Sequence, residues 1–85
     1  MDEMTEQERA QRIHELDVTL WVGKNGVGAV VDELNDQLAD TDLVKVKFLR
    51  AARGGTTTGE LADDLAAQVN GSVVRTRGHT AVIER

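Results

Sequence analysis

The feature that most constrains the fold is the alternation of short apolar segments with segments of helical periodicity. Val18–Val22 (VTLWV) and Leu43–Leu49 (LVKVKFL) are short and rich in β-branched or aromatic residues, which favours strands. After the first segment, apolar residues recur at offsets of three, four, seven and eleven, which predicts one face of an amphipathic helix that ends near Ala39. These residues are Val27, Val30, Val31, Leu34 and Leu38. Strands that alternate with helices in this way require crossover connections.

Capping signals predict two further helices. Thr5–Glu8 and Thr57–Glu60 both match the capping box, in which a threonine accepts a hydrogen bond from the amide three residues later. We therefore expect one helix from about Glu6 to Leu16 and another that begins near Thr57. Gly71 is expected to end this last helix as a left-handed cap. The residues predicted to face inward from it are Leu61, Leu65, Ala66 and Val69.

The C-terminal part of the chain predicts a hairpin. Ser72–Arg77 (SVVRTR) and Thr80–Arg85 (TAVIER) have the composition of strands, and Gly78-His79 between them fits a hairpin turn. The predicted order is α-β-α-β-α-β-β. We therefore expect a single α/β domain over residues 1–85 with a four-stranded mixed sheet, largely parallel, to which the hairpin adds an antiparallel strand.

The composition limits the kinds of site that the chain can build. With 85 residues, it is expected to have a compact core and no large enclosed active site. It has no cysteine and two isolated histidines, so we expect neither disulfides nor a metal site. The sequence shows no nucleophile paired with a base and no carboxylate pair, because the acidic residues follow the exposed faces of the predicted helices. We predict no enzyme activity and no cofactor.

The acidic charge is concentrated at the N-terminus. The formal net charge is −5, and residues 1–19 carry six acidic residues and two arginines. An acidic start and the lack of a long apolar run predict no signal peptide, no membrane contact and a cytoplasmic location. An Asp-rich, lysine-poor and proline-free chain also fits a cytoplasm of high salt, although solubility alone explains an acidic surface equally well. Unfolding measured in molar KCl and in low salt separates the two, because only the first interpretation requires salt.

Gly23-Lys24-Asn25-Gly26 stands between the first predicted strand and the next helix. A turn that enters a helix presents free backbone amides, and glycines let a phosphate approach them closely. Lys24 would add a positive charge at the tip. The alternative is that the two glycines only supply unusual backbone angles and that Lys24 is solvated. The pattern differs from a P-loop, because no Ser or Thr follows Lys24, and from the dinucleotide fingerprint in its glycine spacing.

Two predicted strands each carry basic residues on one face. Apolar and basic residues alternate in Leu43–Leu49, so both lysines point away from the core, and the two arginines of Ser72–Arg77 likewise share a face. If these faces coincide, the sheet carries a basic stripe near two loop arginines. The alternative is ordinary solvated charge opposite the core. The candidate residues are Lys45, Lys47, Arg50, Arg53, Arg75 and Arg77.

Three segments together resemble the CRM domain (chloroplast RNA splicing and ribosome maturation), whose single-domain prokaryotic members are the YhbY proteins. The segments are VTLWVGKNGVGAVVDELNDQL, DLVKVKF and VVRTRGHTAVIER, in this order. They contain the strand-GxxG-helix unit, the basic strand and the final hairpin of that family, and the resemblance covers essentially the whole chain. It implies a fold similar to that of the C-terminal domain of bacterial initiation factor three.

The resemblance also implies a function. It implies binding to structured RNA and association with precursors of the large ribosomal subunit, with the GxxG motif at Gly23–Gly26 and the basic strand at Lys45 and Lys47. We therefore predict an RNA-binding protein that binds ribosomal RNA during large-subunit assembly. No DNA partner is expected, and a monomer is favoured. The alternative is a protein-interaction module in which the exposed sheet face or the acidic first helix docks a partner protein.

The aromatic content predicts how RNA would be recognised. The chain has one tryptophan, one phenylalanine and no tyrosine, so it lacks the aromatic platforms of RRM and OB modules. Trp21 is predicted to lie in the core, and readout is predicted to be of the RNA backbone and shape. His14 and His79 are interpreted as bystanders, although His79 lies in the hairpin turn, where a ligand could reach it.

Overall fold

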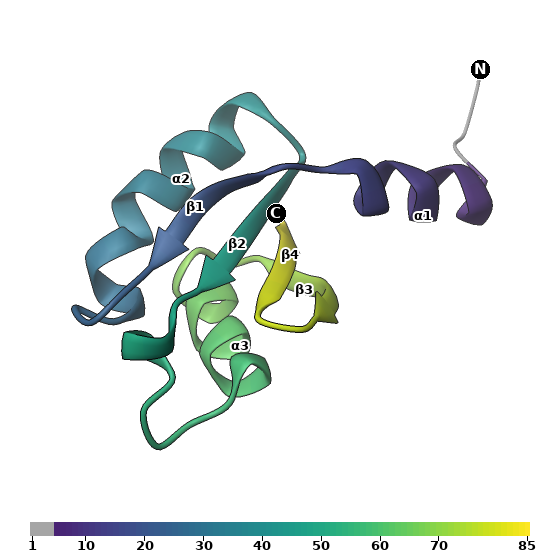
Figure 1. The fold of residues 1–85 in the computed structure, drawn as a ribbon. Coiled ribbons are helices and arrows are strands. Elements are labelled where there is room, and N and C mark those ends of the chain that lie inside the picture. The colour runs from purple at the N-terminus through teal and green to yellow at the C-terminus, as the bar shows by residue number, and fades with distance from the viewer. Residues whose placement is uncertain (1–4) are drawn as a thin grey trace.

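The computed structural model describes residues 5–85, and the order of its elements agrees with the predicted α-β-α-β-α-β-β (Figure 1). Residues 1–4, which include two of the acidic residues counted at the N-terminus, lie outside the described residues. The α-helices and strands are α1 (Glu6–Glu15), β1 (Val18–Val22), α2 (Val31–Asp40), β2 (Leu43–Phe48), α3 (Thr58–Gln68), β3 (Ser72–Arg77) and β4 (Thr80–Glu84). Two short 3₁₀ helices, η1 (Val27–Val30) and η2 (Arg50–Ala52), precede α2 and follow β2.

The four strands form one mixed sheet in the order β1-β2-β4-β3. β1 and β2 are parallel, whereas β4 is antiparallel to both β2 and β3. The prediction of a four-stranded mixed sheet is confirmed, but largely parallel pairing was wrong. The crossover through α3 leaves β3 parallel to β2 but one position away, and the hairpin inserts β4 into the gap between them.

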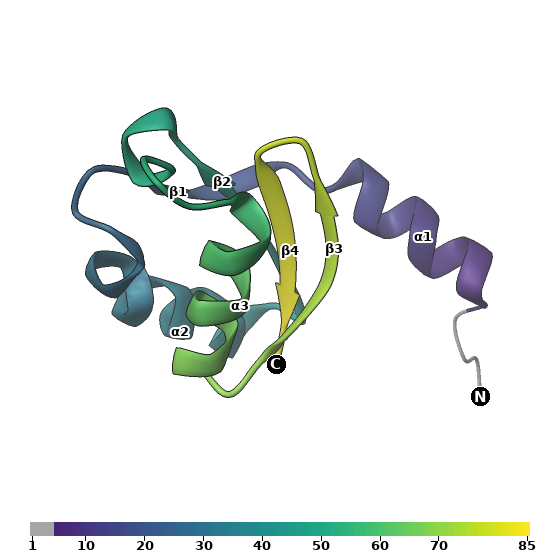
Figure 2. The same ribbon diagram turned by 90° about the horizontal axis from the view of Figure 1, so that it is seen from below.

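Two helices cover one face of this sheet. Figure 2 shows α2 and α3 on the same side, with α1 beyond the opposite side. The core between these two helices and the sheet is apolar. Each fully buried Leu or Phe side chain there contributes about 1.5–3 kcal/mol to stability. The largest fully buried residues of this core are Phe48, Leu34, Leu65, Ile83, Val22, Val44 and Val46. We call the covered side of the sheet the inner face and the other side the outer face.

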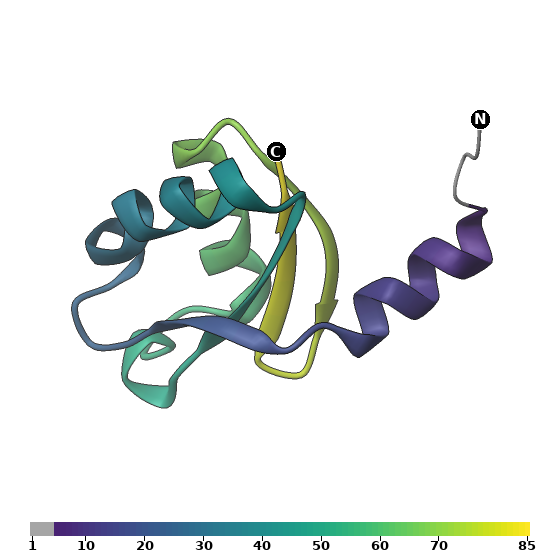
Figure 3. The ribbon, with the colours of Figure 1, turned by 90° about the horizontal axis from the view of Figure 1, so that it is seen from above.

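Helix α1 packs on the outer face through a small second cluster. Ile13 is buried there against Leu43 and Val82. A salt bridge of 2.7 Å joins Arg9 Nη2 to Glu84 Oε2, at the end of β4. Beyond these contacts the helix projects from the body of the domain (Figure 3). Helix α1 therefore covers only part of the outer face.

The predicted capping threonines begin α1 and α3. Thr5 Oγ1 accepts a hydrogen bond of 3.1 Å from the Glu8 N–H, and Thr57 Oγ1 accepts one of 3.2 Å from the Glu60 N–H. Each bond satisfies one of the amide groups that a helix leaves free in its first turn. The starts of both helices were therefore predicted correctly from the capping box.

The end of α3 differs from the prediction. Gly71 is not in the left-handed conformation, which belongs instead to Asn70 at a φ of 56°. Position 71 is restricted to glycine for another reason. A Cβ at this position would lie 2.7 Å from the Glu84 carbonyl oxygen and 3.2 Å from Ile83 Cγ2. The chain therefore needs a glycine here for close approach to β4 and an asparagine for the left-handed angle.

Both edge strands contain an irregularity. In β1 the pairing register with β2 shifts between Val18 and Leu20, and in β3 the register with β4 shifts between Val73 and Arg75. Such bulges bend a strand and increase its twist. The hairpin between β3 and β4 turns at Gly78, whose φ of 58° fits a glycine, as the predicted turn requires.

Candidate nucleic-acid interface

The strand register brings the basic residues of two strands onto one face. Lys45 and Arg75 both pair with Val82 of β4, and Lys47 and Arg77 both pair with Thr80. Directly paired residues point to the same side of a sheet. The two basic faces therefore coincide on the outer face, where they form rows across β2, β4 and β3. We call Lys45, Lys47, Arg75 and Arg77 the basic face.

Trp21 lies on this same side, and its predicted place in the core was wrong. It pairs with Lys47 and is 51% exposed, whereas its neighbours Leu20 and Val22 are buried against the inner core. The strand alternates, so burying Leu20 and Val22 directs the indole ring outward. Helix α1 docks at the other part of the outer face, over Val82, and leaves Trp21 uncovered.

The four cations of the basic face differ in how far the protein already uses them. Lys45 is half-buried and its Nζ donates a 3.3 Å hydrogen bond to the Leu16 carbonyl oxygen, and Arg77 Nη1 lies 3.2 Å from His14 Nδ1. Within residues 5–85, the side chains of Lys47 and Arg75 make no such contact, and both are exposed. Lys47 and Arg75 are therefore the members most available to a ligand.

Two shallow hollows extend the basic face. One, of about 200 Å³, has an apolar floor of Ile13 and Val82 and is rimmed by cationic or imidazole side chains. These rim residues are His14, Lys45, Arg75 and Arg77. Arg77 also lines a second hollow of about 390 Å³ together with Arg53 and His79. His79, which was interpreted as a bystander, thus shares a hollow with two arginines.

The loop arginines occupy different positions. Arg50 is exposed at the start of η2, one residue beyond the Leu49 that follows β2. Arg53 is half-buried, and its Nε donates a 3.0 Å hydrogen bond to the Phe48 carbonyl oxygen. This bond fixes the loop against β2. Arg53 therefore has a structural partner, although it also lines the hollow with Arg77.

The GKNG turn follows β1 and carries Lys24 and Asn25 exposed at its tip. The Gly26 N–H donates a 3.0 Å hydrogen bond to the Gly23 carbonyl oxygen, and Gly26 has a φ of 79°. The expectation that this turn leads directly into an α-helix was wrong, because η1 intervenes before α2. The first bond of η1 runs from Ala29 N–H to the Gly26 carbonyl oxygen, so the two amides between these residues precede it.

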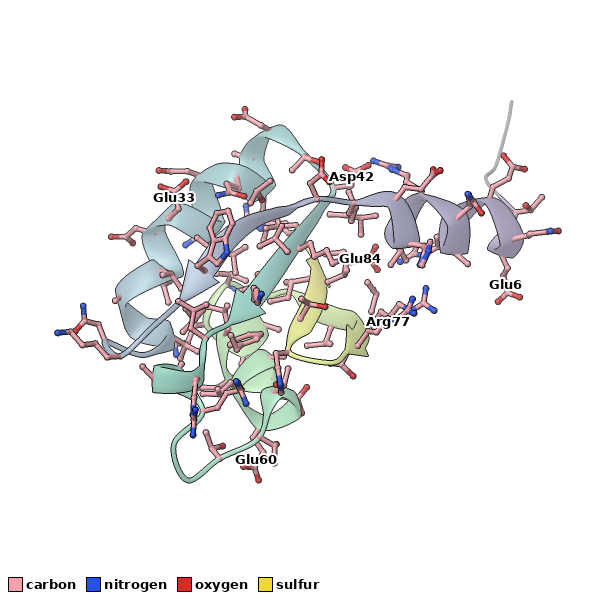
Figure 4. The ribbon with its side chains drawn as sticks, in the orientation of Figure 1. Glu6, Glu33, Asp42, Glu60, Arg77 and Glu84 are labelled. Atoms are coloured by element: carbon pink, nitrogen blue, oxygen red, sulfur yellow. The ribbon has the colours of Figure 1, made fainter. Side chains whose placement is uncertain are left out.

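Acidic side chains gather on the helices of the inner side. The exposed acidic residues of α2 and α3 are Asp32, Glu33, Asp36, Asp40, Glu60, Asp63 and Asp64. Figure 4 shows Glu33 and Glu60 pointing outward from α2 and from the start of α3, whereas Arg77 extends from β3 on the side of α1. At an ionic strength of 0.1 M, exposed charges more than about 10 Å apart are largely screened from each other. The outer face is therefore basic even though the whole chain has a net charge of −5.

Two structural limits apply to the described part of the chain. No helix there combines the length and the apolar character that crossing a bilayer needs. Within residues 5–85, no three His, Cys, Asp or Glu side chains gather in a way that could hold a metal ion. All the buried residues of that range are apolar.

Sequence comparison identifies similar proteins. A protein of Methanocaldococcus jannaschii, named probable RNA-binding protein MJ0652, is 35% identical to this chain over 74 residues, which is 87% of the chain. The chain spans about half of that relative, covering 55% of its length. Among solved structures, that of the hypothetical protein SAV1595 from Staphylococcus aureus, whose name marks it as a candidate RNA-binding protein, superposes with a TM-score of 0.72. It is 26% identical, and the match covers 89% of this chain and 78% of that protein.

The family follows from a match over the full sequence. The profile of the CRS1 / YhbY (CRM) domain matches residues 1–85. This chain, with the three α-helices and the mixed sheet described above, is similar in fold to that solved structure. The resemblance seen in the sequence is thereby confirmed, and this chain belongs to the CRS1/YhbY (CRM) domain family.

Proposed function

We propose that this protein binds structured ribosomal RNA during assembly of the large ribosomal subunit, and that the basic face makes the main contact. The observation that carries the proposal is the register of β2, β4 and β3, which places four cations on one face of the sheet. Family membership and the RNA-binding names of the two similar proteins support it.

The basic face can bind a polyanion although the net charge of the whole chain is negative. Lys47 and Arg75 are exposed and without protein partners within residues 5–85, so a phosphate could bind them at no cost in broken contacts. Cations that contact phosphates release counterions, which favours binding at low salt. The acidic residues of α2 and α3 lie on the other side of the sheet and would orient the RNA toward the outer face.

The GKNG turn is proposed as a second contact. Lys24 is exposed at its tip, and the amides of Val27 and Gly28 precede the first hydrogen bond of η1. Amide donors act at short range and are screened by salt less than a pair of exposed charges. A protein that works at high salt would therefore rely more on this turn, and one that works at low salt more on the basic face.

Paired charge removal tests the main contact. The variant K47Q/R75Q removes two exposed cations of the basic face, and the control R12Q/R85Q removes two exposed cations elsewhere, so both variants change the net charge equally. With a fragment of large-subunit ribosomal RNA, we expect only K47Q/R75Q to make the dependence of log K on log salt shallower, by about 1.5. Equal slopes for the two variants would show that the contact is not on the basic face.

A protein-interaction module is the second candidate function. It is favoured by the projection of α1, whose exposed residues include Glu6, Glu8 and Glu15 (Figure 3). A basic partner surface could dock on this acidic helix. Failure of the wild type to bind any ribosomal RNA fragment at any salt concentration would favour this candidate over RNA binding.

A further inference from the structure

Two large apolar side chains are unusually exposed among the described residues, and both lie at the same end of the outer face. Trp21 is 51% exposed and Leu49 is 39% exposed. Leu49 follows β2 directly, and its N–H donates a 2.8 Å hydrogen bond to the Val22 carbonyl oxygen of the adjacent β1. Single exposed apolar residues are ordinary on protein surfaces. Two large ones, one on β1 and the other directly after the adjacent β2, form a patch that needs an explanation.

Gly23 makes this patch flat. Leu49 Cδ1 lies 3.9 Å from the position that a Cβ on Gly23 would occupy, so Leu49 lies beside a backbone that carries no side chain. Gly23 is two residues after Trp21, and two residues is the repeat of a strand, so both positions face the same side. Trp21, Gly23 and Leu49 together form what we call the flat patch.

Cations border the flat patch. Lys47 is the cross-strand partner of Trp21, Lys24 follows Gly23, and Arg50 follows Leu49. All three side chains are exposed. An apolar protein surface would gain nothing from three cations that have no partner among residues 5–85, whereas a nucleotide presents an apolar ring beside a negative phosphate. The charge of the border therefore selects a nucleic acid as the occupant of the patch.

We propose that the flat patch is a stacking platform for one unpaired nucleobase of the bound RNA. The base lies on the Trp21 indole, with Leu49 and the Gly23 backbone beneath its edge, and Lys47 with Lys24 or Arg50 holds the adjoining phosphates. A base inside a duplex already stacks on its neighbours and has no free ring face. The inference rests on the proposed function and deepens it: the RNA recognised is one with unpaired bases, in a loop, a bulge or a single strand.

The proposal changes the expected mode of recognition. The low aromatic content predicted readout of the backbone and shape alone, because Trp21 was placed in the core. With Trp21 on the surface, one aromatic platform adjoins the basic face, and stacking of a single base on an aromatic side chain typically strengthens binding about 5- to 150-fold. The stacked base would add a requirement for an unpaired nucleotide at a fixed distance from the phosphates.

The single tryptophan provides the first readout, since no other residue contributes indole fluorescence. Wild-type protein is titrated with an oligoadenylate of about twenty nucleotides, and separately with the blunt duplex that the same strand forms with oligouridylate. We expect the single strand to quench Trp21 fluorescence strongly and the duplex to leave it nearly unchanged. Equal quenching by both would overturn the platform, because a duplex offers no base face along its length.

Variants provide the second readout, with binding followed by the polarisation of labelled RNA. We expect Trp21→Leu to weaken binding of the single strand about tenfold and leave duplex binding within about twofold, whereas Trp21→Phe keeps most of the affinity. Leu49→Ser keeps the tryptophan and should reduce both the quenching and the affinity for the single strand. Far-UV circular dichroism confirms that each variant is folded. If Trp21→Leu does not fold, the loss of affinity and of quenching in Leu49→Ser tests the proposal instead.

The outcomes distinguish this inference from the function on which it rests. RNA binding that leaves Trp21 fluorescence unchanged and is equal for wild type and Trp21→Leu would overturn the platform and leave the basic face as the contact. If neither of these RNAs nor any fragment of large-subunit ribosomal RNA binds at any salt concentration, the proposed function and the platform both fail, and a protein partner becomes the occupant to seek.

Discussion

Substitution of Gly71 by alanine tests the packing between the end of α3 and β4. The added Cβ would lie 2.7 Å from the Glu84 carbonyl oxygen, 3.2 Å from Ile83 Cγ2 and 3.4 Å from Val69 Cγ2. The first of these atoms belongs to the backbone, so it cannot rotate away as a flexible side chain would. The strand or the loop must shift instead, and overpacking of this kind costs about 1–3 kcal/mol.

Two effects set the net magnitude. Alanine restricts the unfolded chain more than glycine does, which stabilises the folded state by about 0.4–1 kcal/mol where the native angles allow it. The expected net loss for Gly71→Ala is therefore about 1–2 kcal/mol. For a domain of this size, 1 kcal/mol corresponds to about 4–8 °C in Tm, so we expect Tm to fall by roughly 5–15 °C.

Gly54→Ala is the matched control. No atom lies within 4 Å of a Cβ built at Gly54, and its φ is outside the left-handed region. It should therefore show only the effect on the unfolded chain and keep or slightly raise the Tm. Both variants are compared with wild type by thermal unfolding followed by circular dichroism. A Gly71→Ala variant as stable as Gly54→Ala would refute the close approach to Glu84.

Two further predictions concern helix ends. Thr57→Ala removes the hydroxyl that accepts from the Glu60 N–H and should lower the free energy of unfolding by about 1 kcal/mol in urea titrations, whereas Thr57→Ser should change it little; equal losses would show that the hydroxyl is not the cap. Asn70 has a φ of 56°, so Asn70→Ala should destabilise by about 1 kcal/mol and Asn70→Gly should be neutral, with Tm as the measurement. A neutral Asn70→Ala would contradict the left-handed angle.

Most of the fold could be predicted from local patterns. The bounds of β1 were predicted correctly, and the capping threonines placed the starts of α1 and α3, because periodicity and capping act within a few residues. The pairing of strands was predicted less well. Which strand lies beside β2 depends on whether the hairpin inserts between β2 and β3, and this is decided by contacts between distant segments.

The face of a strand was predictable for β2 but not for β1. In β2, lysines alternate with apolar residues, so only one orientation is compatible with an apolar core. In β1 both faces carry apolar residues, since Leu20 and Val22 point one way and Trp21 the other. Which of them is covered depends on where α1 docks. The alternation of Leu20 and Val22 with Trp21 was the available signal, but size and aromaticity pointed toward the core.

Gly71 shows a similar limit for a single position. Both asparagine and glycine tolerate the left-handed conformation, so the Asn70-Gly71 pair does not say which residue adopts it. The need for a glycine at 71 comes from the approach of β4, which is a tertiary contact. The RNA-binding roles of Gly23–Gly26 and of the basic face remain predictions, for which the experiments above provide the tests.

The bulges in β1 and β3 have a consequence for how copies of the protein behave at high concentration. These two strands are the edges of the sheet, and a regular edge strand offers a row of unpaired N–H and C=O groups on which a strand from another molecule can add. A register shift within each edge interrupts that row and twists the strand locally. Both edges are therefore poor templates for intermolecular strand addition, which protects the domain from aggregating through its sheet.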